Sequence, residues 1–361
     1  MKKTLVALAV AAVAATSANA AVVYNQDGTK VEVGGQLRLL LAKDKYERAD
    51  LKYGSSRLVF KATQDLGDGY SALGNVEVRF NDPGNDEGKD GGAYAKRLYA
   101  GFAKDGVGQI TFGRQLTNLD DVGLSDFTYD LGGVNLTQTE ANKDIRFRSA
   151  DFGGFQFGLD YFFGEKDEDL YNAKSGFGTS LFYTAQLAQD TTLQLNAGFS
   201  QVKVGAGKFE LSKIDKSWKD VAFDQHKLNS FIVGTRLTSG AFAFAIDYSQ
   251  QKASDEQVGV GFKAPHEDEL VKLPFNKLQQ LEVGAKYNYL DNAAIYGEYI
   301  YRKASINSDL PKVKVNEFIL GTDYKFAKNV ITYVEAGTAN YKFDGDSERD
   351  NKFRVGLRVL F

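Results

Sequence analysis

Residues 353–361 read FRVGLRVLF, and their alternation decides the fold. Apolar side chains alternate with other side chains along this segment, and this period of two residues is that of a β-strand. One face is wholly apolar, whereas Arg354 and Arg358 point to the opposite face. An arginine directed into lipid costs about 2 to 4 kcal/mol at mid-depth of a bilayer. The segment therefore predicts a membrane strand whose arginine face lines a polar interior.

The same alternation recurs from about Lys30 to Phe361, and the helical period is almost absent. Most of the segments are long enough for the roughly 9 to 11 residues of a membrane strand. We predict sixteen strands, so the fold class is all-β. Their centres are Leu37, Lys61, Val76, Tyr99, Thr111, Phe147, Leu159, Phe182, Asn196, Ile232, Ile246, Val283, Tyr296, Ile319, Val334 and Gly356.

The connections between these segments alternate between short and long. Seven tight turns, such as Leu66 to Gly69 and Thr238 to Gly240, separate eight long loops, such as Lys203 to Gln225. Short turns on one rim and long loops on the other are typical of an antiparallel transmembrane β-barrel with short periplasmic turns and long external loops. All four prolines fall in the long loops, as required where every strand is paired on both sides.

The first twenty residues predict a cleaved secretory signal peptide. Lys2 and Lys3 precede an apolar run, and Ala18 to Ala20 forms a small-residue cleavage site. The mature chain, 21–361, is then a single barrel domain. The full sequence has 44 basic and 47 acidic residues. Removal of Lys2 and Lys3 leaves 42 basic residues, so the net charge of the mature chain is −5. That balance excludes nucleic acid as an expected partner.

Catalytic and metal-binding patterns are weak in this sequence. It has no cysteine, and its two histidines, His226 and His266, lie in or beside long loops without an identifiable nucleophile. The acidic stretch Asp344 to Asp350 lacks the glycine and glutamate of a calcium loop, so we interpret it as a hydrated loop. We expect no enzymatic activity, no metal and no cofactor.

Six further stretches are informative: MKKTL (1–5), AAVVYN (20–25), GTKVE (28–32), SRLVFK (56–61), KRLYAGF (96–102) and FGRQ (112–115). Together they resemble a Gram-negative general diffusion porin of the Pasteurellaceae type. This resemblance implies a sixteen-stranded barrel in the outer membrane, a homotrimer, and passive diffusion of ions and small hydrophilic solutes. It also implies contact with outer-membrane lipids and lipopolysaccharide, and recognition of the strand ending in Phe361 by the barrel-assembly machinery.

The third long loop, Gln115 to Asn142, resembles the loop that folds into the lumen in this family. Its segment SDFTYDLGG (125–133) resembles the acidic tip, which places Asp126 and Asp130 at the two lumen carboxylates. The family usually has a Pro-Glu-Phe-Gly-Gly run here, whereas this chain has Tyr129-Asp130-Leu131-Gly132-Gly133. The resemblance implies an acidic side of a pore constriction.

The basic side of that constriction is expected on the barrel wall. Arg57 and Arg97 match two members of the family's basic column, and alternation also turns Arg38 and Arg148 inward. Glu77 matches an inward carboxylate of the third strand. Opposed charges across a narrow pore orient dipolar solutes and bias the passage of ions. Alternatively, these charges only hydrate the lumen or fix the loop.

Three other functions remain as alternatives. A substrate-specific outer-membrane channel would need a row of lumen aromatics. A barrel lipase would need a paired serine and histidine. An adhesin would use the loops for binding without conducting.

Overall fold

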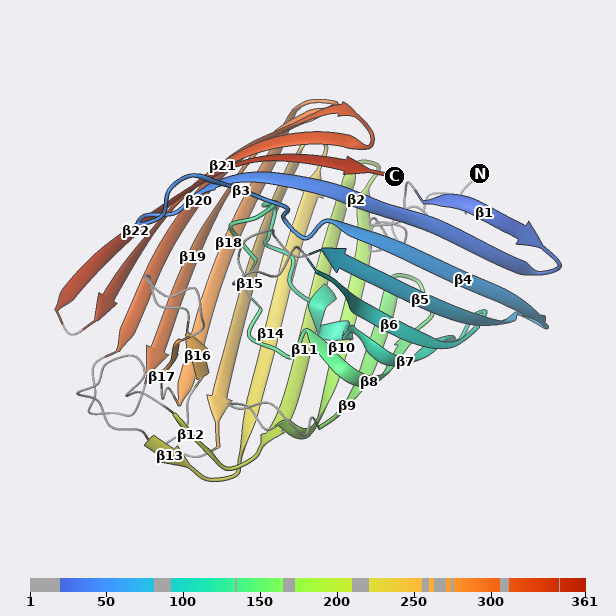
Figure 1. Ribbon diagram of the computed structural model, residues 1–361, viewed down its shortest axis with the longest axis horizontal. Coiled ribbons are helices and arrows are strands. Elements are labelled where there is room, and N and C mark those ends of the chain that lie inside the picture. The colour runs from blue at the N-terminus through green and yellow to red at the C-terminus, as the bar shows by residue number, and fades with distance from the viewer. Residues whose placement is uncertain are drawn as a thin grey trace.

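The computed structural model describes residues 20–80, 92–133, 135–164, 173–209, 221–254, 260–262, 271–273, 276–305, 312–343 and 345–361. Sixteen long strands form the wall of one antiparallel β-barrel. Figure 1 shows how the wall curves round into the barrel. Each strand pairs with its neighbours along the chain, and the first pairs with the last. Every predicted strand centre lies inside one of them, so the predicted strand number is confirmed.

The bounds of the sixteen strands follow the chain around the barrel. They are β2 (Thr29–Lys43), β4 (Arg57–Gly67), β5 (Tyr70–Phe80), β6 (Ala93–Lys104), β7 (Gly108–Leu116), β8 (Glu140–Ser149), β9 (Phe155–Phe163), β10 (Ala173–Ala188), β11 (Thr191–Val204), β14 (His226–Ser239), β15 (Phe242–Ala253), β18 (Lys277–Leu290), β19 (Ala293–Ser305), β20 (Val313–Ala327), β21 (Val330–Phe343) and β22 (Asp346–Leu360).

The barrel closes where β2 divides its pairing between two partners. Residues 29–36 of β2 pair with β4, and residues 36–43 pair with β22. Beyond the end of β22, the backbone N–H of Gly35 donates to Phe361 O at 2.7 Å, and the N–H of Phe361 donates to Gly35 O at 3.1 Å. Closure leaves the described barrel wall without an open edge. A bilayer does not tolerate such an edge, because unpaired backbone groups find no water there.

The structure also contains several shorter elements. Strand β1 (Ala21–Gln26), which the sequence did not predict, forms a hairpin with β2, and β3 (Asp50–Lys52) pairs with its other half. The remaining short elements are β12 (Gly207–Phe209), β13 (Val221–Phe223), β16 (Val260–Phe262), β17 (Val271–Leu273) and the 3-10 helix η1 (Asn118–Asp121). No helix among the described residues is long and apolar enough to cross a membrane.

The seven predicted tight turns all join neighbouring strands. The long loop predicted between the last two strands is wrong, because only residues 344 and 345 separate β21 from β22. Asp346 to Asp350 belong to β22, and not to a hydrated loop. Polar residues of a strand that extends beyond the bilayer carry no apolar face, so alternation could not distinguish them from a loop. The four prolines and His266 lie outside the described residues.

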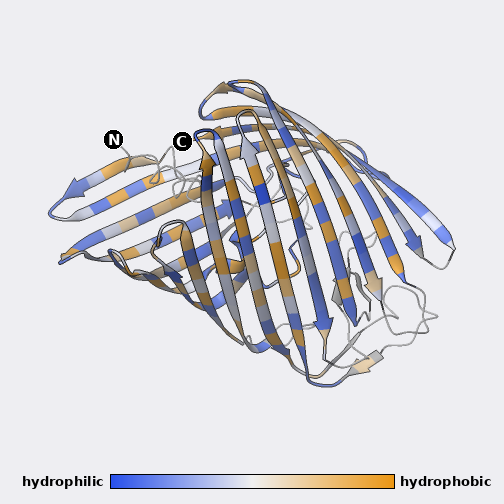
Figure 2. Ribbon diagram, turned by 180° about the vertical axis from the view of Figure 1, so that it is seen from behind, coloured by the Kyte–Doolittle hydropathy of each residue, from blue (hydrophilic) through white to orange (hydrophobic). Residues whose placement is uncertain are grey.

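The two faces of the wall differ as the alternation predicts. On β2, Leu37, Leu39 and Leu41 are exposed on the outer face, whereas Leu40 and Ala42 are buried inside. Alternating colours along the strands in Figure 2 show the same contrast. Each outward apolar side chain stabilises the barrel in lipid, and the inward residues are left to shape the lumen.

Candidate functional site

The connection between β7 and β8, residues 117–139, lies against the inside of the wall, and we call it the inner loop (Figure 1). Its Val122 is fully buried in a cluster with Phe182 and Ile232. Its Tyr129 packs against a second cluster that contains Tyr333. Burial of these side chains removes apolar surface from a polar lumen, which favours one fixed path for the loop.

The inner loop begins with η1. The hydroxyl of Thr117 caps this turn by accepting from Leu119 N at 3.2 Å. Asn118 N donates to Asp160 Oδ1 of β9 at 3.0 Å, and Asn118 Nδ2 donates to Phe147 O at 3.0 Å. The loop is therefore fixed to the wall within three residues of leaving β7.

Further along, Asp247 of β15 holds the backbone of the inner loop. Its Oδ2 accepts from Leu124 N at 2.6 Å, from Ser125 N at 2.7 Å and from Ser125 Oγ at 2.6 Å. From β14, the guanidinium of Arg236 donates through Nε to Leu124 O at 2.8 Å. Hydrogen bonds to a carboxylate are shorter and about twice as strong as neutral ones.

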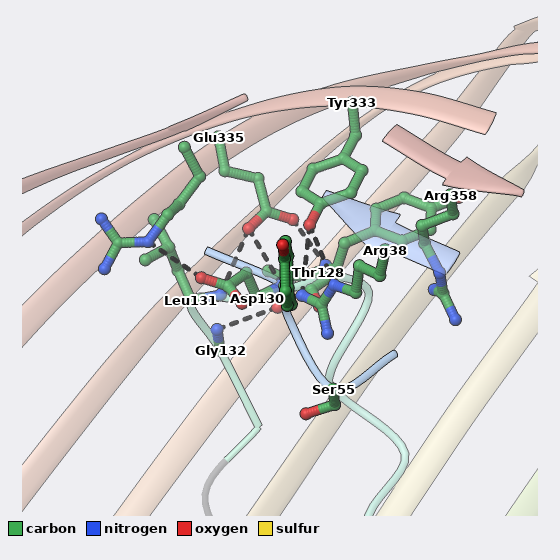
Figure 3. A network of polar contacts seen from close by, with 12 residues as sticks. Arg38, Ser55, Thr128, Asp130, Leu131, Gly132, Tyr333, Glu335 and Arg358 are labelled. Atoms are coloured by element: carbon green, nitrogen blue, oxygen red, sulfur yellow. Dashed lines mark hydrogen bonds and ion pairs between the residues drawn. The ribbon is translucent and has the colours of Figure 1, made fainter. Parts of the chain in front are cut away.

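Two more carboxylates continue this row. Glu298 of β19 accepts from the backbone N–H groups of Phe127 and Thr128. Glu335 of β21 accepts from the N–H of Tyr129, from Asp130 N at 3.1 Å and from Leu131 N at 3.2 Å (Figure 3). We call Asp160, Asp247, Glu298 and Glu335 the anchor carboxylates.

The tip of the inner loop reaches the strands that close the barrel. Asp130 Oδ1 lies 2.7 Å from Arg38 Nη2 of β2, and Asp130 Oδ2 lies 2.9 Å from Arg354 Nε of β22. The ring of Tyr129 stacks on Tyr333 with centroids 4.6 Å apart, and the guanidinium of Arg358 lies 5.4 Å from the Tyr129 centroid. Figure 3 shows this network.

The four expected basic residues contact different carboxylates. Arg38 meets the loop carboxylate Asp130, as just described. Arg148 of β8 lies 3.4 Å from Asp121 of η1, a loop acid that the sequence analysis did not single out. These two arginines therefore contact the inner loop.

Arg57 and Arg97 pair with wall carboxylates instead of with Asp126 or Asp130. Arg57 Nη1 lies 3.5 Å from Glu77 Oε1, and Arg97 Nη1 lies 2.9 Å from Glu140 Oε2. Glu77 is inward, on β5, and its Oε1 also lies 2.6 Å from Arg79 Nε.

Asp126 is the exposed acid of the loop tip. Its Oδ1 accepts from Thr128 N and from Thr128 Oγ1, both at 2.8 Å. Within the part of the chain that the structure describes, it forms no ion pair. Its exposed charge lies within electrostatic range of Arg236 and of Glu298.

Burial changes the proton affinity of two inner-loop groups. It raises the pKa of Tyr129, and the negative charge of Asp323 raises it further, so the phenol stays protonated and donates to Asp323 Oδ2 at 3.0 Å. Burial also raises the pKa of Asp121, while the positive charges of Arg146 and Arg148 oppose that effect. The arginines thus favour the charged form of Asp121.

The sequence analysis missed the anchor carboxylates, Arg79, Arg354 as a partner of Asp130, and Glu140. Alternation could have placed Asp247, Glu298 and Glu335 on the inner face, because each is a lone acid in an otherwise uncharged stretch of strand. Their role as acceptors for one distant loop depends on tertiary structure, which no local pattern reveals.

Known proteins resemble this chain over its whole length. A profile of the Gram-negative porin family matches residues 7–345. The major outer membrane protein of Pasteurella multocida is 41% identical over 379 aligned positions, with both chains covered completely.

Solved structures show the same fold at low identity. The trimer form of in-vitro folded OmpT, an outer membrane protein of Vibrio cholerae, has a TM-score of 0.70 at 21% identity, covering 93% of this chain and 100% of that one. The anion-selective porin of Comamonas acidovorans has a TM-score of 0.66 at 16% identity, covering 92% and 100%. With its match to the family profile and its 41% identical relative, this chain belongs to the Gram-negative porins of the outer membrane.

Proposed function

We propose that this porin is a passive diffusion channel for ions and small hydrophilic solutes whose constriction lies at the inner loop, and that it has no catalytic activity. One observation carries the constriction. Carboxylates of β9, β15, β19 and β21 hold the loop backbone, and Asp130 ties its tip to Arg38 and Arg354. A loop bound at so many points stays inside the barrel and narrows it.

The charges of the constriction form two sides. Asp126 and Asp130 supply the acidic side, and Arg38, Arg57, Arg97 and Arg148 supply the basic side, with Glu77 holding Arg57. Arginine stays protonated in its ion pairs, so a transverse field crosses the lumen. This field orients dipolar solutes, and weak contacts let them leave again.

We further propose how the chain is processed and assembled. Residues 1–20 are removed as a signal peptide, and residues 21–361 form the barrel. Three copies assemble, as supported by the Vibrio cholerae relative described as a trimer form. The long loops face outward towards lipopolysaccharide, and the barrel-assembly machinery recognises the terminal strand that ends in Phe361.

Liposome swelling tests the channel proposal. Purified protein is refolded into liposomes, which are diluted into isotonic solutions of uncharged sugars of increasing size. We expect swelling rates that fall steeply with solute size and rise linearly with protein. Protein-free liposomes are the control.

Two results would contradict the proposal. A folded barrel that admits no sugar would reject a diffusion channel. A rate that saturates for one sugar and excludes others of equal size would support a substrate-specific channel instead.

A further inference from the structure

Four arginines face the lumen from adjacent strands at the barrel closure. Arg358 of β22 is the direct cross-strand partner of Arg38 of β2, and Arg57 of β4 is the direct partner of Arg79 of β5. We call these four residues the seam arginines. Like charges placed directly opposite each other destabilise a sheet pair, so two such pairs side by side require compensation.

The nearby carboxylates compensate only part of this charge. Glu77 serves both Arg57, at 3.5 Å, and Arg79, at 2.6 Å. Asp130 serves Arg38, but it is shared with Arg354. The seam arginines therefore have two carboxylates for four positive charges, and one of these carboxylates has a further partner.

Arg358 is the least compensated member. Among the described residues it has no carboxylate partner, and its hydrogen bond is from Nη2 to Gln36 Oε1 at 2.7 Å. Its Nε and that of Arg57 lack acceptors. Arg57 also lies within range of the positive charges of Arg79, Arg358 and Arg38. An excess of positive charge and of N–H donors is thus concentrated at one place in the lumen.

Arg302 shows the contrast of a lumen arginine that has a carboxylate of its own. Arg302 of β19 lies 3.3 Å from Glu317 of β20, and its Nε donates to Gln280 at 3.1 Å. Arg97 and Lys96 share Glu140, each at 2.9 Å. Arg146 and Arg148 share Asp121, at 3.6 and 3.4 Å. Each of these residues has at least one carboxylate within 4 Å, whereas Arg358 has none among the described residues.

We propose that the seam arginines form a weak binding site for an oxyanion group, a carboxylate or phosphate carried by a permeating solute, and that this site makes the pore favour anions. Planar guanidinium groups match both oxyanions because their N–H donors are arranged as a fork. Binding stays weak because conduction requires release. The inference rests on the proposed channel function and adds its preferred class of solute.

Single-channel recording in planar bilayers tests this site. The reversal potential in a KCl gradient gives the ratio of chloride to potassium permeability, and inorganic phosphate added at constant ionic strength reports occupancy. For the wild type we expect a ratio above one and a chloride current that phosphate reduces saturably. For Arg358→Gln we expect about a fivefold weaker apparent phosphate affinity, as for the loss of one charge-assisted contact.

Two further variants separate a site from general charge. Arg302→Gln removes a lumen arginine that has its own carboxylate, and it should leave the phosphate effect unchanged. Arg358→Lys keeps the charge without the fork, so it should retain anion preference while its apparent phosphate affinity falls towards that of Arg358→Gln. Heat-dependent migration on gels checks that each barrel is folded.

The failures of the two proposals are distinguishable. A channel that conducts with equal phosphate response in the wild type, Arg358→Gln and Arg302→Gln would overturn the oxyanion site and leave the diffusion channel intact. A folded wild-type barrel without conductance would overturn the channel, and the site with it.

Discussion

Asp130 and Arg38 lie 2.7 Å apart, and this contact joins the tip of the inner loop to the strand where the barrel closes. Arg354 Nε of β22 lies 2.9 Å from Oδ2 of the same carboxylate. The loop tip therefore contacts both strands of the closing pair. A carboxylate that resembles a selectivity residue in the sequence is also a structural tie.

Asp130→Asn and Asp126→Asn should differ for this reason. Loss of the Asp130 charge releases two arginines and loosens the loop tip, at a cost of about 1 to 3 kcal/mol in loop docking. We expect a shift towards anion selectivity together with a noisier open-channel current. Asp126→Asn should shift selectivity in the same direction while the open-channel noise stays at the wild-type level. Equal noise in both variants would contradict a structural role for Asp130.

Glu335→Gln should loosen the middle of the inner loop, because an amide replaces the carboxylate that accepts three backbone N–H groups. A loss of about 1.4 to 3 kcal/mol corresponds to roughly a 10- to 100-fold faster hydrogen exchange at Tyr129, Asp130 and Leu131. Glu317→Gln, which changes a wall carboxylate that pairs with Arg302, is the matched control and should leave these amides protected. Unchanged exchange in Glu335→Gln would reject the anchor.

Gly284→Ala should displace the inner loop from the wall. A Cβ at this position of β18 would lie 2.0 Å from the backbone oxygen of Ser125, which is far closer than a van der Waals contact. The loop would move into the lumen, so single-channel conductance should fall. Gly74→Ala, where no atom lies within 4 Å of the added Cβ, is the control. A wild-type conductance in Gly284→Ala would show that the loop does not rest there.

The mature protein should begin at Ala21. Intact mass and amino-terminal sequencing of protein extracted from outer membranes should show the loss of residues 1–20. Retention of Lys2 and Lys3 in the mature chain would contradict the signal peptide.

The wall of the barrel was predictable because every second residue of a lipid-facing strand is apolar. Sixteen predicted centres, from Leu37 to Gly356, fall within sixteen strands. The sequence did not predict that β22 extends into the stretch interpreted as a loop. Outside lipid both faces of a strand are polar, so the alternation disappears there. Strand β1 was not predicted for another reason, because six residues are too few to show a period of two clearly.

The inward charged residues of the proposed constriction were partly predictable, but most of their ion-pair partners were not. Inward placement of Arg38, Arg57 and Arg148 follows from strand alternation. Which acid each arginine meets depends on the path of a loop that is fixed by distant carboxylates. Arg57 thus pairs with Glu77, and Arg148 pairs with Asp121.

The most direct test of the account is the ion selectivity of refolded single channels with the two sides of the constriction changed in turn. One variant combines Asp126→Asn with Asp130→Asn, and the other combines Arg57→Gln with Arg97→Gln. The account predicts that all three proteins conduct and that the reversal potentials of the two variants move in opposite directions from the wild type. A folded wild-type barrel that does not conduct, or two variants that move in the same direction, would contradict it.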